Sequence, residues 1–151
     1  MKKIIFVCLG NICRSPMAEM MMKHLIEEKN LSDQITVASR STSTYEIGNS
    51  PHPGAIAELK NKKIPIIDHH AQQITRQDFD EADVIIGMDQ QNIVNLQNMA
   101  PSVDKDKIHL AYEALGQTKV IEDPWYDHKF GRTYKQLAEV LPVWLKTLLN
   151  Q

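Results

Sequence analysis

The chain has 151 residues, of which 17 are basic and 19 are acidic, so its formal net charge is −2 at neutral pH. This length suits a single domain over residues 1–151 with a substantial core. The charge argues against a nucleic-acid-binding or membrane-surface protein, and the apolar runs fall short of the roughly 20 residues that span a bilayer. Only Cys8 and Cys13 are present; without a disulfide framework, a reducing cytoplasm is expected.

The first predicted strand covers residues 4–7 and is apolar throughout, which indicates a central position in a sheet. It leads directly into the segment Cys8-Leu9-Gly10-Asn11-Ile12-Cys13-Arg14-Ser15-Pro16. A helix is predicted to begin near Ser15 and Pro16, since proline is favoured at a first helical position. The segment therefore reads as strand, tight loop and helix.

The loop between Cys8 and Arg14 has the length to form an anion cradle. Its backbone N–H groups can point at one centre, and the following helix directs its positive end to the same place. Gly10 and Asn11 are expected to supply the unusual backbone angles of such a loop. Arg14 is suited to grip two phosphate oxygens, and Cys8 is expected beneath the anion as a thiolate.

This Cys-x5-Arg-Ser spacing directly after an N-terminal strand resembles the low-molecular-weight protein tyrosine phosphatases, a family of acid phosphatases. The whole run from residue 8 to residue 16 is similar to the signature loop of that family. The resemblance implies that Leu9, Gly10, Asn11, Ile12, Cys13, Arg14 and Ser15 form the phosphate-binding loop. It extends over most of the chain, from about residue 3 to residue 148.

The remaining elements are predicted in chain order. The first helix ends near Asn30 and packs through a methionine-rich face. A strand over residues 34–38 precedes a polar loop over 39–53, a helix over 55–62 and an extended piece over 64–67. A short helix begins at Thr75, a buried strand lies within 83–88, a helix capped by Asp89 stops before Pro101, and a fourth strand covers 107–110. The last helix spans about 129–149, where Pro142 is expected to cause a kink or a break.

Strands that alternate with helices predict an α/β fold with a parallel sheet. The resemblance implies the same architecture in more detail. It is a single-domain three-layer fold with a four-stranded parallel sheet, helices on both faces and the phosphate-binding loop after the first strand. The long polar loop at the end of the second strand lies where open α/β sheets carry their sites.

A cysteine phosphatase also needs an acid, because the phenolate of tyrosine is a poor leaving group. The candidate is Asp123 in the run Glu122-Asp123-Pro124-Trp125-Tyr126. This run is similar to the Asp-Pro-aromatic-aromatic acid loop of the family, which assigns the role to Asp123 rather than to the rival carboxylate of Glu122. A positioned general acid typically contributes about 10²- to 10⁴-fold in rate.

The resemblance implies a protein tyrosine phosphatase that hydrolyses phosphotyrosine in proteins and small aryl phosphates. The catalytic residues are then Cys8, Arg14 and Asp123, and the intermediate is a phosphocysteine. No cofactor and no metal are expected, because Arg14 and the backbone neutralise the phosphate. Inorganic phosphate and other oxyanions are expected to inhibit. We expect a mildly acidic optimum, since the thiol must be ionised while the acid is still protonated.

Further residues are assigned through the same resemblance. Four residues are expected to hold the loop in shape: Asn11, Ser15, Ser39 and His69. Ser15 is also expected to form a hydrogen bond with the nucleophilic sulfur. Leu9, Tyr45, Trp125 and Tyr126 are expected to form a wall around the substrate ring, although core packing is the alternative for an isolated aromatic such as Tyr45. Arg40 departs from the family pattern and is expected to point to water. Cys13 matches a second family cysteine, which implies a reversible bridge to Cys8.

Three rival functions stay open at this point. An arsenate reductase of similar fold would need a relay of further cysteines, and none follows Cys13. A non-catalytic phosphate- or phosphopeptide-binding module would require neither Cys8 nor Asp123. A metal site at Cys-x4-Cys lacks a second pair of ligands, and the adjacent His69 and His70 lack a third.

Overall fold

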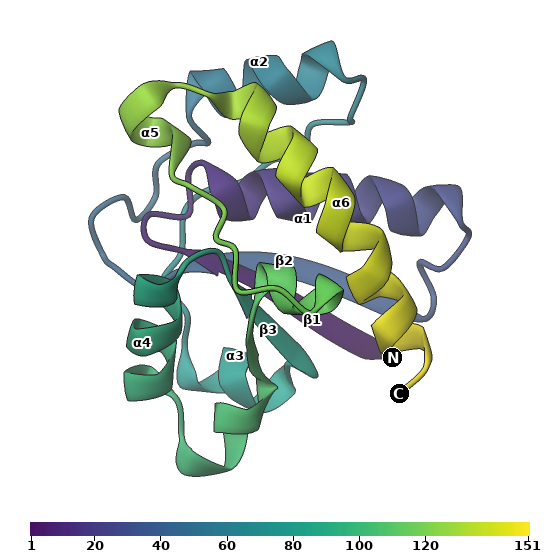
Figure 1. Cartoon of the computed structure of the whole chain (residues 1–151), viewed down its shortest axis with the longest axis vertical. Coiled ribbons are helices and arrows are strands. Elements are labelled where there is room, and N and C mark those ends of the chain that lie inside the picture. Colours follow the sequence, from purple (N-terminus) through teal and green to yellow (C-terminus); the bar gives the residue numbers. More distant parts are fainter.

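The computed structural model describes residues 1–151, which form one parallel sheet covered by helices (Figure 1). The strand order is β2-β1-β3-β4, with β1 at Lys2–Cys8, β2 at Ile35–Ser41, β3 at Val84–Gly87 and β4 at Ile108–Leu110. The α-helices are α1 at Arg14–Glu28, α2 at Pro53–Asn61, α3 at Arg76–Glu81, α4 at Gln90–Met99, α5 at Pro124–Asp127 and α6 at Phe130–Leu149. Two 3₁₀ helices cover Ser102–Lys107 and Ala111–Leu115.

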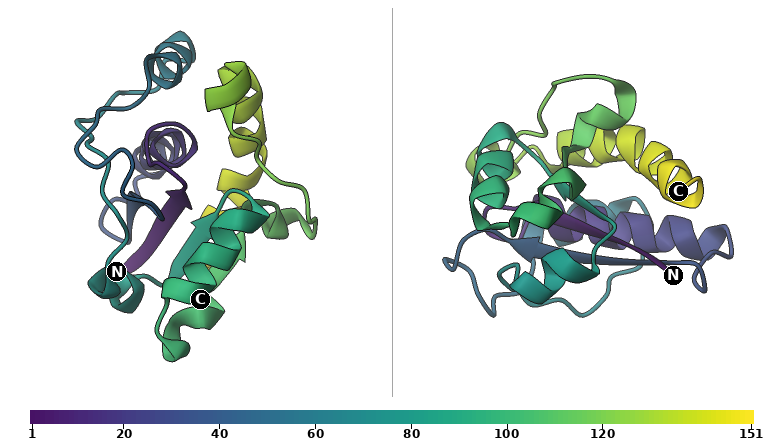
Figure 2. Two further views of the ribbon diagram at one scale, coloured as in Figure 1. Left: turned by 90° about the vertical axis from the view of Figure 1, so that its left-hand side faces the viewer. Right: turned by 90° about the horizontal axis from the view of Figure 1, so that it is seen from below.

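The central strand β1 is buried on both faces, as its apolar run predicts. Its side chains alternate between two core clusters. Ile4 and Phe6 face the larger cluster beneath α1 and α6, whereas Ile5 and Val7 face a smaller one that includes residues of α3 and α4. The helices α1 and α6 lie side by side on one face of the sheet, as both views in Figure 2 show. The fold is therefore the predicted three-layer α/β arrangement.

The carboxyl end of the sheet gathers several segments that are far apart in the sequence. The loop after β1, the loop after β2, the first turn of α4 and the short helix α5 all lie at this end, on the left of Figure 1. Ligands of open α/β sheets bind at this edge. The topology thus places the Cys8 loop and the Asp123 loop next to each other although 115 residues separate them.

The predicted helices and strands are confirmed, with differences at their ends. The strand β2 continues through Ser41, so the residues at 39–41 are in the sheet and not in the polar loop. The helix α1 begins at Arg14, and Pro16 is its third residue; a proline is tolerated there because the first N–H groups of a helix have no intrahelical partner. Residues 64–67, predicted as an extended piece, belong to neither a helix nor a strand, and α5 was not predicted.

Of the two alternatives predicted at Pro142, a kink or a break, the break is wrong, because α6 continues through Pro142; the kink stays a prediction. Pro142 itself is exposed, and the residues around it anchor the helix to the core. Trp144 is nearly buried and its Nε1 donates a hydrogen bond to the carbonyl of Ala111 at 2.8 Å. Tertiary packing of the apolar face compensates for the backbone hydrogen bond that proline cannot donate.

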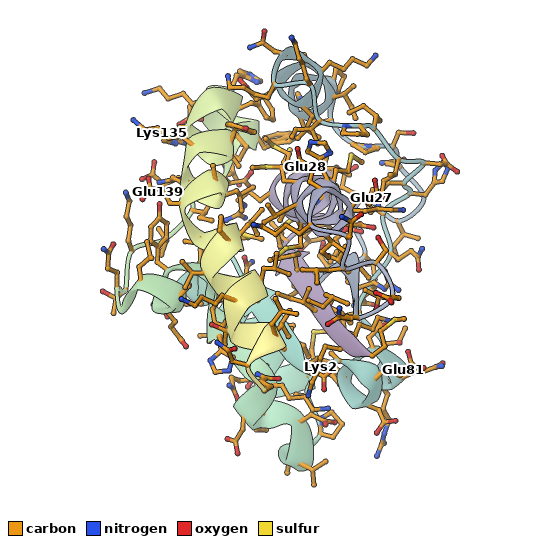
Figure 3. All side chains as sticks on the ribbon, turned by 90° about the vertical axis from the view of Figure 1, so that its right-hand side faces the viewer. Lys2, Glu27, Glu28, Glu81, Lys135 and Glu139 are labelled. Atoms are coloured by element: carbon orange, nitrogen blue, oxygen red, sulfur yellow. The ribbon has the colours of Figure 1, made fainter.

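The outward side of α6 is polar. Lys135 and Glu139 extend from it, away from α1, in Figure 3. No helix in the structure combines the length and the apolar character needed to cross a membrane.

Candidate active site

The sulfur of Cys8 lies at the end of β1, directly below the loop. The residue is nearly buried, and its Sγ is 3.1 Å from the hydroxyl Oγ of Ser15 in the first turn of α1. The structure therefore brings the predicted nucleophile and Ser15 into contact. A hydroxyl in this position can donate a hydrogen bond that stabilises a thiolate.

The guanidinium of Arg14 is fixed by two hydrogen bonds from the far side. Its Nη1 donates to Oδ2 of Asp89 at 2.7 Å and to the carbonyl of Ile121 at 2.8 Å, and the side chain is only 2% exposed. Burial alone would lower the pKa of Arg14, but the negative charges of Cys8, Asp89 and Asp123 raise it. The guanidinium therefore keeps its charge, and its buried Nε has no partner within the protein.

The contact between Asp89 and Arg14 was not predicted from the sequence. The sequence predicts Asp89 only as the cap of α4, and Asp89 does accept a hydrogen bond from the backbone N–H of Asn92 through Oδ1 at 2.8 Å. Its second carboxylate oxygen is free for Arg14. Asp89 thus caps α4 and also orients the guanidinium of Arg14. Only the tertiary structure reveals this second role.

Asn11 holds the middle of the loop in shape. Its φ of 60° lies in the left-handed region, and the residue is fully buried. Its amide nitrogen donates to the hydroxyls of Ser15 at 2.8 Å and Ser39 at 3.0 Å, while Oδ1 accepts from the backbone N–H of Gln72 at 3.1 Å. The expectation that Gly10 also needs unusual angles is wrong, because its φ is not positive.

His69 and Ser39 each contact Asn11 of the loop, and both also contact the carboxylate of Glu19. His69 Nε2 lies 3.0 Å from the carbonyl of Asn11, and its Nδ1 lies 3.5 Å from Oε1 of Glu19. Ser39 donates to the same oxygen of Glu19 at 2.5 Å. Glu19, on the α1 helix, was not predicted as a site residue, although it lies four positions after Ser15, on the same helix face.

Substitutions of Asn11 separate its hydrogen bonds from its backbone conformation. We expect Asn11→Gly to lower the free energy of unfolding by about 3 kcal/mol, because three hydrogen bonds, two of them buried, are lost. Asn11→Ala should lower the free energy of unfolding by about 1 kcal/mol more than Asn11→Gly does, since alanine is strained at a positive φ. Urea unfolding of both variants checks this. A glycine variant no more stable than the alanine variant would contradict the role of the left-handed conformation.

The carboxylate of Asp123 lies close to the guanidinium of Arg14. It caps α5, accepting a hydrogen bond from the backbone N–H of Trp125 through Oδ1 at 3.1 Å, and its Oδ2 lies 3.6 Å from Nη2 of Arg14. The side chain is 23% exposed, so it is accessible from the cavity. The neighbouring Glu122 instead pairs with Arg132 at 2.8 Å and does not line the cavity.

Arg132 on α6 connects both ends of the acid loop, defined here as residues 122–127. Its Nη1 contacts Glu122 at 2.8 Å and Oδ2 of Asp127 at 2.9 Å. The backbone N–H of Lys129 and the guanidinium of Arg132 lower the pKa of Asp127, so that the pair is charged at neutral pH. The three side chains thus hold the segment that carries Asp123.

We expect Arg132→Gln to lower kcat for phenyl phosphate by about threefold to fivefold. This is the size of effect expected when a partly exposed ion-pair network that positions Asp123 is lost. The loss should be smaller for p-nitrophenyl phosphate, whose leaving group depends less on an acid. Steady-state kinetics on both substrates measure this, with Arg76→Gln, an exposed arginine outside the acid loop, as the matched control. Unchanged kcat on phenyl phosphate would show that Arg132 does not position the acid.

These groups surround one cavity of about 250 Å³. Its floor includes Cys8, Cys13 and Arg14, and its walls are Leu9, Gly10, Ile12, Tyr45, Glu46, Asp123, Trp125 and Tyr126. Tyr45 is 79% exposed and Tyr126 is 74% exposed, so neither ring is core packing. The rings of Trp125 and Tyr126 meet edge to face at 5.2 Å. Glu46 was not predicted as part of this wall.

The environment of Arg40, next to the loop, differs from the prediction. Arg40 does not point to water, because its Nε contacts Oδ2 of Asp78 at 3.1 Å and its Nη1 donates to the carbonyl of Ser39 at 2.8 Å.

Burial and the negative charges of Cys8 and Asp123 raise the pKa of Cys13, which keeps this second sulfur a neutral thiol. Both cysteines are free in the structure.

Comparisons with known proteins agree over nearly the whole chain. A family model described as low molecular weight phosphotyrosine protein phosphatase matches residues 3–151. The proteins of that name from Saccharomyces cerevisiae and Homo sapiens are 39% and 40% identical, over 95% and 96% of this chain and 92% and 94% of theirs. The crystal structure of SP-PTP, the low molecular weight protein tyrosine phosphatase from Streptococcus pyogenes, has a TM-score of 0.86 and 42% identity over 98% of this chain and 93% of that chain.

Proposed function

Because this chain belongs to the low molecular weight phosphotyrosine protein phosphatase family, we propose that it works through Cys8, Arg14 and Asp123. It is a protein tyrosine phosphatase, and therefore a hydrolase of phosphate monoesters. The roles of individual residues, the intermediate and the wider substrate range are our proposal. The observation that supports them is that a sulfur and a guanidinium from one loop, and a carboxyl from a distant segment, line one cavity.

In the first step the thiolate of Cys8 attacks phosphorus. The S–P bond forms as the bond from phosphorus to the tyrosyl oxygen breaks, and Asp123 gives its proton to the departing phenolate. Arg14 and the N–H groups of the loop bind the three equatorial oxygens, where charge is spread in the transition state. The buried Nε of Arg14, which has no partner in the protein, is a donor for one of them.

In the second step water hydrolyses the phosphocysteine. The carboxylate of Asp123 accepts a proton from the water as its oxygen bonds to phosphorus, and the S–P bond breaks to return the thiolate and inorganic phosphate. The hydroxyl of Ser15, 3.1 Å from the sulfur, stabilises this leaving group. Asn11, Ser39 and His69 act by keeping the loop in its binding conformation.

The exposed aromatic wall supports phosphotyrosine, and small aryl phosphates, as the substrates. Tyr45, Trp125 and Tyr126 stand at the mouth of the cavity, where they can contact a flat apolar ring that phosphoserine lacks. Inorganic phosphate and similar oxyanions should compete for the same cradle. We propose that the enzyme acts in the cytoplasm, on phosphotyrosine-containing proteins and without a metal or cofactor.

The test compares matched phosphotyrosyl and phosphoseryl peptides in the presence of a metal chelator. Release of inorganic phosphate from the first peptide alone, with competitive inhibition by added phosphate, is the expected result. Equal rates on both peptides would contradict the aromatic wall. Thiol-dependent reduction of arsenate without release of phosphate would instead favour the arsenate reductase alternative.

A further inference from the structure

A second hollow adjoins the catalytic cavity and shares two wall residues with it. It is a shallow space of about 410 Å³, and both Leu9 and Tyr45 line it as well as the catalytic cavity. Its far side is formed by side chains of α4 and of the segment before α3. We call this hollow the amide groove, after Gln73, Asn95 and Asn98, which line it together with Thr42.

The amide groove contains hydrogen-bonding groups that the protein itself does not fully use. The Asn98 side chain makes no hydrogen bond within the protein and is exposed. Asn95 accepts from Gln91 through Oδ1 at 3.0 Å, which leaves its two N–H donors free. Gln73 donates to the carbonyl of Thr42 at 3.0 Å, which leaves its Oε1 as an acceptor. The hydroxyl of Thr42 also has no partner, but its oxygen is buried and is not one of the exposed groups.

The groove differs from the catalytic cavity in charge. The cavity is lined by Arg14, Glu46 and Asp123, whereas no charged side chain lines the groove. Free amide donors and acceptors without charge match the backbone of a peptide and neutral polar side chains. They offer no ion pair to an acidic or basic residue, which would lose hydration there without compensation.

The position of the groove indicates which part of a substrate reaches it. A phosphotyrosine enters the cavity with its side chain first, so the main chain of the substrate stays at the rim near Tyr45. An extended chain advances by about 3.3 Å per residue, so a residue one or two positions away can extend over the shared wall. We propose that the amide groove binds the residues next to phosphotyrosine in a protein substrate and favours neutral polar ones; this rests on the function proposed above.

The test uses the double variant Asn95→Ala with Asn98→Ala and two substrates, a phosphotyrosyl peptide flanked by Asn, Gln and Ser, and p-nitrophenyl phosphate. We expect kcat/KM for the peptide to fall about tenfold relative to kcat/KM for p-nitrophenyl phosphate, since two hydrogen bonds are lost. The loss should be in KM rather than kcat. Val94→Ala, an exposed change on the same helix outside the groove, is the matched control.

A second measurement needs no variant. The unsubstituted enzyme should hydrolyse the neutral polar peptide with a higher kcat/KM than the same peptide with Glu or Lys at the flanking positions. An equal loss on both substrates in the double variant, or no preference among the peptides, would overturn the groove as a peptide site. Failure of the proposed function would be distinguishable, because the unsubstituted enzyme would then not hydrolyse p-nitrophenyl phosphate.

Discussion

Replacing Cys8 with serine is expected to abolish turnover while leaving the fold and the anion cradle in place. A serine hydroxyl is a far weaker nucleophile than a thiolate, and a loss of roughly 10⁴-fold or more in kcat is expected when a nucleophile is removed. The smaller side chain fits the same buried position and can still contact Ser15, 3.1 Å away in the intact protein. Initial rates with p-nitrophenyl phosphate at high enzyme concentration measure the loss.

The matched control for this variant is Cys13→Ser. Cys13 lies in the same loop and is equally buried, but its raised pKa keeps it a neutral thiol. The control should therefore retain clear turnover. Binding of inorganic phosphate to Cys8→Ser, followed by thermal shift, shows that the cradle persists. Comparable activity in Cys8→Ser and the unsubstituted enzyme would remove Cys8 from the mechanism.

The second large effect is expected for Asp123→Asn, and its size should depend on the leaving group. Asparagine keeps an oxygen for the backbone N–H of Trp125, so the cap of α5 is preserved. It cannot donate a proton as a carboxylic acid does, and the cost should reach about 10²- to 10⁴-fold for phenyl phosphate. For p-nitrophenyl phosphate, whose phenolate is stable without protonation, the loss should be much smaller.

A series of aryl phosphates with increasingly basic leaving groups measures this directly. The logarithm of kcat should fall more steeply with leaving-group basicity in Asp123→Asn than in the unsubstituted enzyme. Glu81→Gln is the control, because that carboxylate contacts Lys3 outside the cavity and the acid loop, so the slope should not change. Parallel slopes in Asp123→Asn and the unsubstituted enzyme would contradict the assignment of the acid.

Local patterns in the sequence are enough to predict most of the fold. The apolar run of β1 is buried on both faces, the Thr75 cap forms with Asp78 as its partner, and α4 ends before Pro101. These features depend on residues that are near one another in the chain. The continuity of α6 through Pro142 depends instead on contacts such as that of Trp144 with Ala111, which are set by the tertiary fold.

The candidate site shows the same division. The sequence motif places Cys8 and Arg14 in one loop, and the resemblance adds Asp123. The partners that fix these groups come from distant segments: Asp89 is 75 residues from Arg14, and Gln72 is 61 residues from Asn11. Arg40 illustrates the limit of local reasoning, since its partner Asp78 lies 38 residues away. Such pairs follow from strand order and register, which no short motif contains.

The central claim is that the sulfur of Cys8 becomes covalently phosphorylated during turnover. Rapid acid quench of the enzyme with p-nitrophenyl phosphate, followed by mass spectrometry of the intact chain and its peptides, tests it most directly. The account predicts one added phosphoryl group, located on Cys8 and lost again as the substrate is consumed. Turnover without a phosphorylated enzyme, or with the phosphoryl group on another residue, would contradict it.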